Sequence, residues 1–348
     1  MNKQMLIWKS IIDSLQKNIP VMLLYVLESN GSSPGRQGFF MAVNAGGQME
    51  GSVGGGIMEH KFVEMAKAGL QEESNEGSVY KQIHDKAASK NQSGMICSGE
   101  QTIVLYKIQQ RDGIHIGNII SSLEKNENGT LHLSPGGILF EDNLPAKNFD
   151  FNLKDQNNWA YIEKTGYKNY LYIVGGGHCA LALSKIMSMM DFYITVFDER
   201  EKLNTIEKNY YAHEKKIVQE YTELSQFIAP GKNNYVVIMT FGYRSDDVAI
   251  RALLNKDFKY FGVLGSKNKM KKMFTDYRKE NIGEEILKKI HAPIGLQIKS
   301  QTTEEIAISI AAEIIKTNIG GILPGIGIIN NFWPGPVNCS QAHRAWFA

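Results

Sequence analysis

The sequence YLYIVGGGHCA, residues 170–180, decides the fold of the second half of this chain. A strand-like apolar run precedes a G-x-G-x-x-A motif, and apolar residues recur at helical spacing from Ala180 onward. Gly175 allows a tight turn, Gly177 lets a pyrophosphate approach the backbone, and the small Ala180 lets the helix pack closely on the strand. The order strand, glycine motif, helix predicts a Rossmann-type nucleotide-binding unit whose helix N-terminus faces an anion.

The next predicted strand, 193–197, ends at Asp198, at the separation of roughly 20 residues expected of an acid that binds the ribose of a dinucleotide. Arg200 follows closely and suits a phosphorylated ribose, so the sequence leaves both NAD and NADP open. His178 lies beside the predicted phosphates, where it either donates a hydrogen bond to the ligand or caps the turn. Cys179 is interpreted as a small buried residue rather than a nucleophile.

Strand-like runs alternate with helical patterns through the second half, which indicates a parallel sheet with helices on both faces. The runs are 170–174, 193–197, 215–219, 235–240 and 260–264. The predicted fold class is therefore α/β, with a C-terminal Rossmann-type doubly wound parallel sheet and an N-terminal mixed α/β domain. We place the N-terminal domain at 1–145, a linker at 146–169, the Rossmann-like domain at 170–318 and a docked C-terminal tail at 319–348.

The first half combines helix and strand patterns around glycine-rich loops. Apolar residues at helical spacing predict a helix over 7–15, and a second helix follows the glycine run 54–56. The Gly- and Pro-containing segment 30–35 is predicted to be a loop. Strands are predicted at 21–27, 39–43, 48–53 and 101–108.

Two segments of the first half are candidate anion sites. Ser32 and Ser33 lie in one glycine-containing loop, and the run Gly54, Gly55, Gly56 precedes a predicted helix. Successive backbone N–H groups in such turns favour a phosphate. The alternative, that these glycines only permit tight turns, weighs equally.

Three further residues are candidates for function. Gly265 and Ser266 follow a predicted strand, at the sheet edge where doubly wound folds bind ligands. Cys97, in a loop of small residues before a strand, could carry sulfur, although a reactive thiol needs a lowered pKa. His60 and Glu64 share a helical face without a third ligand, so no metal site is expected.

The composition excludes several classes of protein. With 38 basic and 36 acidic residues and a net charge of +2, the chain lacks the electrostatic footprint of a nucleic-acid-binding protein. No apolar run has the length of a membrane span, and the first residues lack the apolar stretch of a signal peptide. Three cysteines without framework spacing indicate reduced thiols. We therefore expect a cytoplasmic protein that binds neither nucleic acid nor membrane.

The motifs of both halves, taken together, resemble the XdhC/CoxI family of accessory factors for molybdenum hydroxylases such as xanthine dehydrogenase. The resemblance extends over about 26–316 of the chain and is much more specific than the glycine motif alone. The segments that carry it are 31–34, 51–59, 97–99, 174–178, 196–200, 262–269, 291–296 and 303–313.

This resemblance implies a protein that holds the molybdenum cofactor (molybdopterin), supports replacement of an oxo by a sulfido ligand, and delivers the cofactor to an apo molybdenum hydroxylase. It also implies a homodimer that works with a cysteine desulfurase as sulfur donor. Two residues depart from the family pattern, because Ile57 stands where many relatives have cysteine and Phe241 where relatives often have histidine. Cys97 is then the first-half thiol left to contact sulfur or molybdenum.

The resemblance favours an accessory factor over a turnover enzyme. The alternative is an NAD(P)-binding oxidoreductase, which the glycine motif and Asp198 favour. Its weakness is that no Tyr-Lys or His-Asp catalytic pair occurs at recognisable spacing. A nucleotide-sensing interaction module without chemistry is a third hypothesis, since fold does not determine ligand.

Overall fold

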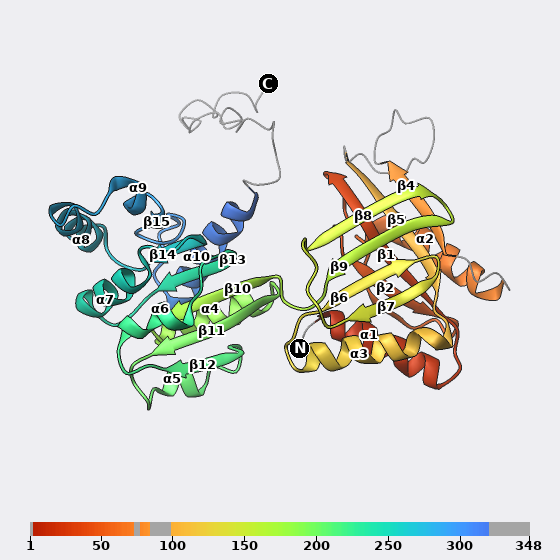
Figure 1. The fold of residues 1–348 in the computed structure, drawn as a ribbon, viewed down its shortest axis with the longest axis horizontal. Helices are drawn as coiled ribbons and strands as arrows, with labels where there is room; N and C mark the ends of the chain where they lie inside the picture. The colour runs from red at the N-terminus through yellow and green to blue at the C-terminus, as the bar shows by residue number, and fades with distance from the viewer. Residues whose placement is uncertain (1–2, 73–76, 84–98, 320–348) are drawn as a thin grey trace, which may run out of the picture. The chain divides into compact units, whose positions relative to one another are not determined.

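The computed structural model of the protein describes residues 3–72, 77–83 and 99–319 (Figure 1). The chain divides into two compact units between Tyr170 and Leu171, and the short segment Met189–Tyr193 belongs to the first unit. Among the described helices, none is long and apolar enough to cross a lipid bilayer.

The first unit contains two antiparallel sheets. The five-stranded sheet has the order β3-β2-β1-β5-β4, and the four-stranded sheet has the order β7-β6-β9-β8. The strands of the first are β1 (Val21–Gly31), β2 (Phe40–Asn44), β3 (Met49–Gly51), β4 (Ser78–Ile83) and β5 (Gly99–Lys107). Those of the second are β6 (Thr130–Ser134), β7 (Gly137–Glu141), β8 (Phe149–Asp155) and β9 (Asn158–Lys164).

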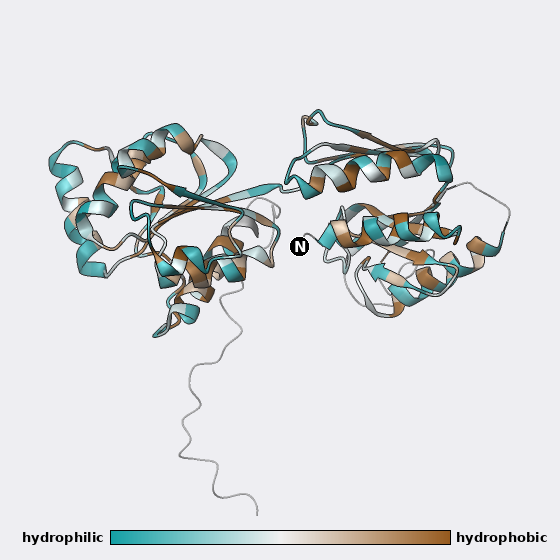
Figure 2. Ribbon diagram, turned by 90° about the horizontal axis from the view of Figure 1, so that it is seen from below, coloured by the Kyte–Doolittle hydropathy of each residue, from teal (hydrophilic) through white to brown (hydrophobic). Residues whose placement is uncertain are grey.

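Three helices cover the faces of these sheets. The helix α1 (Lys3–Gln16) contacts β2, β3 and α3 (Gly113–Glu124), and α3 contacts β7, so the two helices lie between the sheets (Figure 2). Their buried side chains, such as Trp8 and Ile119, join those of both sheets in one core. The helix α2 (Gly56–Gln71) packs on the other face of the five-stranded sheet, because Phe62, Ala66 and neighbouring apolar residues form one buried stripe.

A buried carboxylate joins the two sheets of the first unit. Glu163 in β9 is 1% exposed and accepts hydrogen bonds from the hydroxyls of Tyr25 (2.6 Å) and Tyr161 (2.7 Å). The Nζ atom of Lys168 donates a third bond of 2.5 Å and supplies the opposite charge. Burial, together with the charge of Glu163, raises the pKa of Tyr25 well above its usual value. The buried charge is thus paired and hydrogen-bonded, as its burial requires.

The linker predicted at 146–169 is not a linker. Its residues form β8 and β9, which complete the four-stranded sheet of the first unit. The buried residues of β9 alternate, with Trp159, Tyr161 and Glu163 facing inward, while the residues between them face outward. The abundance of Asn, Asp and Lys concealed this period-two pattern in the sequence. The segment 30–35 is also shorter as a loop than predicted, because Asn30 and Gly31 still pair with β5.

The second unit is built on a six-stranded sheet with the order β12-β11-β10-β13-β14-β15 (Figure 1). Its strands are β10 (Asn169–Val174), β11 (Phe192–Asp198), β12 (Glu214–Ile217), β13 (Gly231–Ile238), β14 (Phe258–Val263) and β15 (Ile290–His291). The pairs β11–β12, β13–β14 and β14–β15 are parallel. Counted within the unit, the order is 3-2-1-4-5-6, that of dinucleotide-binding Rossmann folds. The predicted α/β class with a parallel C-terminal sheet is confirmed.

Helices connect and cover these strands. They are α4 (His178–Ser188), α5 (Asn204–Glu207), α6 (Leu224–Phe227), α7 (Tyr243–Leu253), α8 (Lys267–Lys279), α9 (Glu284–Leu287) and α10 (Thr303–Ile319). The helix α10 packs against α4 and begins at a capping box, where the Glu305 amide donates to the Thr302 hydroxyl (3.2 Å) and the Thr302 amide donates to the Glu305 carboxylate (3.2 Å). The predicted docked tail lies outside the described residues beyond Ile319.

Candidate functional site

The turn between β10 and α4 depends on Gly175. Its φ of +102° is a conformation that L side chains rarely adopt, and a Cβ there would lie 2.4 Å from the carbonyl oxygen of Met239. The Gly175 amide donates to the carbonyl of Phe197 (2.8 Å), and the Met239 amide donates to that of Val174 (2.8 Å). The turn is therefore held between β11 on one side and β13 on the other.

Gly177 and His178 form the open part of this turn. Apart from Gly177 itself and its neighbours along the chain, no heavy atom lies within 4 Å of the place that a Cβ on Gly177 would occupy. The Gly177 amide has no acceptor among the described residues, and the exposed His178 is the first residue of α4. Ala180 is fully buried, as the motif requires. These features leave room for an anion at the helix N-terminus.

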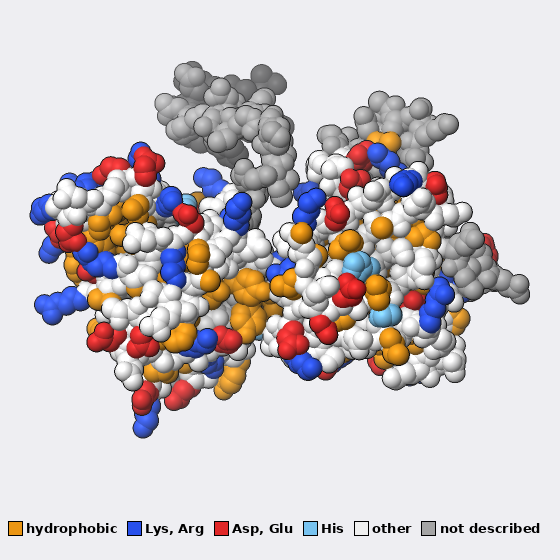
Figure 3. Space-filling model, viewed as in Figure 1, with side chains coloured by type: hydrophobic (Ala, Val, Ile, Leu, Met, Phe, Trp, Pro, Cys, Tyr) orange, Lys and Arg blue, Asp and Glu red, His pale blue; other side chains and the backbone are white. Residues whose placement is uncertain are grey.

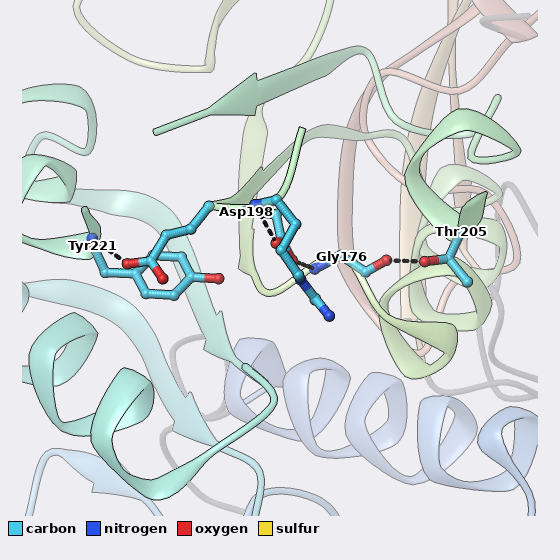
Figure 4. A network of polar contacts seen from close by, with 6 residues as sticks. Gly176, Asp198, Thr205 and Tyr221 are labelled. Atoms are coloured by element: carbon cyan, nitrogen blue, oxygen red, sulfur yellow. Dashed lines mark hydrogen bonds and ion pairs between the residues drawn. The ribbon is translucent and has the colours of Figure 1, made fainter. Parts of the chain in front are cut away.

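The carboxylate of Asp198 is not open to a ligand. The residue is 0% exposed and accepts hydrogen bonds from the Gly176 amide (2.7 Å) and the Arg200 amide (2.9 Å) (Figure 4). The Nε and Nη2 atoms of Arg200 each donate a further bond of 2.8 Å. Burial by itself would raise the pKa of Asp198, but the bonds from Arg200 and Gly176 outweigh it and hold the pKa below its usual value. Asp198 is thus an ionised group bound within the protein.

Arg200 meets Phe241 across the end of β10. The guanidinium carbon of Arg200 lies 5.3 Å from the centroid of the Phe241 ring, which is 72% exposed. Arg200 follows β11 and Phe241 follows β13, and these two strands flank β10. The contact therefore crosses the carboxyl end of β10, next to the glycine turn.

The polar side chains that follow β13 and β14 mainly bind other groups of the protein. Asp246 at the start of α7 is 0% exposed and accepts hydrogen bonds from the Thr240 hydroxyl (2.5 Å) and amide (3.1 Å). Its second oxygen is paired with Lys269. Ser266 caps α8 by accepting from the Lys269 amide (3.2 Å), and a Cβ on Gly265 would meet the Met270 side chain at 2.8 Å. Lys269 is therefore already engaged with an internal anion.

In the first unit, tertiary contacts bring three predicted segments together. The Ser33 hydroxyl (2.6 Å) and the Gly35 amide (3.1 Å) both donate to Oε1 of Gln101 in β5. A Cβ on Gly54 would lie 2.4 Å from the Gly35 nitrogen, and one on Gly99 would lie 2.5 Å from the Ser32 oxygen. The segments 32–35, 51–56 and 99–101 are thus in backbone contact.

The glycine turn at 54–56, a candidate anion site in the sequence, already binds a carboxylate of the protein itself. One oxygen of Glu59, Oε2, accepts hydrogen bonds from the Ser52 hydroxyl (2.6 Å), the Val53 amide (2.9 Å) and the Gly55 amide (3.0 Å). Gly55 and Gly56 have positive φ, and nothing lies within 4 Å of a Cβ on either. The glycines therefore shape an anion-binding turn, but Glu59 occupies two of its amides.

Of the two cysteines considered for chemistry, Cys97 and Cys179, the structure describes only Cys179. Cys97 lies outside the described residues. Cys179, the second residue of α4, is half-buried, and burial followed by the charge of Glu304 raises the pKa of its thiol. Among the described residues, no group of three or more His, Cys, Asp or Glu side chains is arranged to hold a metal ion.

Glu59, Gln101 and the Arg200–Phe241 contact were not predicted from the sequence. Glu59 carried a signal, because an acidic residue early in a helix often bonds back to the amides before it. Gln101 carried none, since a glutamine in an apolar strand does not reveal its partner.

Figure 3 shows basic and acidic side chains interspersed over the visible face of each unit.

A groove of about 470 Å³ lies elsewhere in the first unit, along β4 and the β8–β9 turn. The Gln156 side chain lines it and forms hydrogen bonds of 2.8 Å with both the amide and the carbonyl of Val79. This groove contains none of the predicted site residues. The glycine turns, and not the groove, are therefore the candidate site.

Comparison with known proteins agrees with this architecture. The family model described as XdhC Rossmann domain matches residues 171–314, and that of the XdhC and CoxI family matches residues 14–80. Two curated proteins align with most of the chain. The "Uncharacterized protein YqeB" of Escherichia coli is 24% identical over 88% of this chain, which spans 45% of that protein. A Bacillus subtilis protein described as a probable xanthine dehydrogenase subunit is 23% identical, over 87% of this chain and 94% of its own length.

The fold has also been seen in a crystal. A structure described as a xanthine dehydrogenase from Bacillus halodurans superposes with a TM-score of 0.65 at 22% identity, over 92% of this chain and 98% of that one. At this identity the likeness concerns the fold alone. Since one family model matches within each of the two units, the chain belongs to the XdhC and CoxI family.

Proposed function

We propose that this protein is an accessory factor that binds the molybdenum cofactor, supports its sulfuration and inserts it into a hydroxylase of the xanthine dehydrogenase type. The observation that carries the proposal is the match of one XdhC model in each unit, together with the alignment along 94% of a Bacillus subtilis protein described as part of a probable xanthine dehydrogenase. The structure adds support through the open glycine turn at the carboxyl end of β10, where the strand order of the second sheet reverses direction and Rossmann folds bind ligands.

The residues of the second unit fit the phosphate of this cofactor. The empty space beside Gly177 and the first amides of α4 would accept a phosphate, and Arg200 lies across the same strand end. When bound, the cofactor supplies the molybdenum centre and its exchangeable oxo or sulfido ligand. In this proposal the protein's own groups orient the guest: backbone amides bind the phosphate, and the exposed His178 lies beside them.

The first unit fits a second phosphate less well. Glu59 occupies the Val53 and Gly55 amides, so an anion could use them only after displacing that carboxylate. Gly56 remains open beside them. We propose instead that this region serves the sulfuration step, because Gly99, two residues after Cys97 in the sequence, contacts Ser32.

The partners in this proposal are an apo molybdenum hydroxylase, which receives the cofactor, and a cysteine desulfurase, which supplies sulfur. The proposed working form is a homodimer in the cytoplasm. Support for these partners comes from the family resemblance, and the reduced cysteines expected from the sequence agree with that compartment.

The first test is whether the protein holds a pterin. Protein purified from a host that makes molybdopterin is oxidised, and the released pterin is measured by fluorescence. We expect the wild-type chain to release pterin and Gly177→Asp to release at least tenfold less, because its carboxylate would take the place of the phosphate. Gly283→Asp is the matched control, since Gly283 also has open space around it but lies outside the turn. If the wild-type protein holds no pterin and takes up none on addition, the proposal fails.

The second test concerns delivery. Loaded protein is mixed with an apo molybdenum hydroxylase, with and without a cysteine desulfurase and cysteine, and the hydroxylase activity is measured. We expect activity only when the loaded protein and the sulfur source are both present. Activity that the Gly177→Asp variant restores equally well would contradict the role of the turn.

One observation favours a second candidate, an NAD(P)-binding oxidoreductase. The strand order of the second sheet is that of dinucleotide-binding folds. Calorimetry with NAD(H) and NADP(H) tests this candidate, and absence of binding at millimolar ligand removes it.

A further inference from the structure

Asp198 stands where a Rossmann fold usually binds the ribose hydroxyls, yet its binding capacity is already used. An ionised carboxylate offers about four lone-pair sites. Four donors occupy the carboxylate of Asp198: the amides of Gly176 and Arg200, and the Nε and Nη2 atoms of Arg200. The residue is 0% exposed, so no solvent-facing site is left for a hydroxyl.

The contacts around Asp198 reinforce this arrangement. The Thr205 hydroxyl donates to the carbonyl of Gly176, and a Cβ on Gly176 would lie 2.3 Å from the Ile206 side chain. Tyr221, whose amide donates to Glu199 (2.9 Å), lies on the opposite side of Asp198 from Gly176 (Figure 4). The segment after β11 is thus packed on the turn, and Asp198 is enclosed on both sides.

Arg200, in contrast, retains binding capacity. A guanidinium has five N–H donors, and two of them are bound to Asp198. The other three, on Nη1 and Nη2, have no acceptor among the described residues, and the side chain is 41% exposed. The bidentate bond to Asp198 holds the guanidinium in place, and its central carbon lies over the Phe241 ring. A planar guanidinium held in this way suits the oxygens of a phosphate.

We propose that Asp198 is a positioning residue, and that Arg200 with Phe241 selects ligands that carry a phosphate monoester over ligands that offer only ribose hydroxyls. The inference rests on the proposed function in one respect, that a phosphorylated ligand enters this crevice. It goes further by naming which group is recognised and which residue recognises it. A molybdopterin phosphate and the 2′-phosphate of NADP share this chemistry.

The experiment compares matched ligands that differ only in one phosphate monoester. The pairs are NADP⁺ and NAD⁺, adenosine 2′-monophosphate and adenosine, and the oxidised pterin phosphate of molybdopterin and its phosphatase-treated form. Affinities of the full chain are measured by calorimetry. Where a pair binds at all, we expect its phosphorylated member to have at least tenfold higher affinity, since a bidentate bond to a guanidinium is charge-assisted.

Variants then assign the preference to its residues. Arg200→Gln should abolish the affinity ratio within each pair, and Arg200→Lys should retain part of it as a point charge. Asp198→Asn should reduce the ratio as well, because Arg200 is no longer held, whereas a merely structural defect would weaken both members of a pair equally. Lys202→Gln is the matched control, since Lys202 is an exposed cation in the same loop, and it should leave the ratio unchanged.

The outcomes separate this inference from the proposed function. Equal affinity within every pair, or a ratio that survives Arg200→Gln, overturns the inference. Phosphate preference among the nucleotides without any pterin binding keeps the inference and rejects the molybdenum cofactor. Pterin binding that does not depend on Arg200 keeps the proposed function and rejects the inference. Absence of binding by every ligand rejects both.

Discussion

The Ser33 hydroxyl donates a 2.6 Å hydrogen bond to Oε1 of Gln101, and both residues are buried. The same oxygen accepts the Gly35 amide, and the Gln101 amide group donates to the sulfur of Met58 (3.0 Å). One side chain from β5 therefore ties the serine loop to the helix that follows the glycine run. The arrangement of the first-unit site depends on this contact.

Gln101→Ala is expected to lower the free energy of unfolding by about 2 kcal/mol. The buried Gly35 amide loses its acceptor, and the Ser33 hydroxyl keeps only the carbonyl of Gly35 (2.9 Å). Urea unfolding followed by circular dichroism measures the change. Ser33→Ala, which removes one of the two donors, should cost less. Gln297→Ala is the exposed control. If Gln101→Ala and Gln297→Ala are equally stable, the contact does not stabilise the site.

Gly175→Ala is expected to destabilise the second unit strongly, by about 3 kcal/mol or more, since it adds backbone strain to a collision with Met239. Gly177→Ala should change stability by less than about 1 kcal/mol, because its Cβ enters open space. Thermal unfolding of the two variants measures the difference. Equal melting temperatures would contradict the described turn.

Asp198→Asn is expected to cost about 1–3 kcal/mol at pH 7, because buried donors lose a charged acceptor. The folded pKa of Asp198 lies below its usual value of 3.8, so the stabilisation is complete above that pH and is lost as the pH falls through the folded pKa. The difference between variant and wild type should therefore be constant between pH 7 and about pH 5 and should shrink below pH 3.8.

Urea midpoints at a series of pH values measure this dependence. Asp257→Asn serves as the control, because Asp257 is 83% exposed and pairs with Lys289 at the surface. Its effect should stay below about 1 kcal/mol at every pH. A cost of Asp198→Asn that does not change at acid pH would show that its charge is not what stabilises the turn.

Cys179 is expected to react slowly with alkylating reagents, because burial and the charge of Glu304 raise the pKa of its thiol above the usual 9.0. A variant in which Cys97 and Cys339 are serine isolates this thiol. At pH 8, iodoacetamide should modify the folded variant several-fold more slowly than the same variant in urea, and Glu304→Gln should speed the folded reaction. Equal rates in the folded and unfolded states would contradict the assigned environment.

Each of the five predicted runs lies on or overlaps an observed strand of the second unit. The strands β10, β11, β13 and β14 were predictable because their buried segments are apolar runs, whereas β12 is a partly exposed edge strand with the sequence EKKI. The four-stranded sheet was not predicted. In β9 only alternate residues are buried, and β8 has only partly buried or exposed residues, so polar residues such as Asn152 and Lys154 make up half of the two strands. The sheet also pairs strands that are not consecutive in the sequence. The strand β6 pairs with β7, which follows it directly, and with β9, which comes after β7 and β8.

The sequence by itself determined the glycine motif, the strand that precedes it, the helix that follows and the family to which the chain belongs. These features depend on local backbone conformation and on spacing along the chain, which a sequence states directly. Only the tertiary structure decided that the Asp198 carboxylate is hydrogen-bonded to Arg200 and that the Glu59 carboxylate binds the amides of the glycine turn in the first unit. Whether a polar side chain is open to a ligand depends on which donors the fold brings within about 3 Å of it, and such neighbours cannot be counted along the chain.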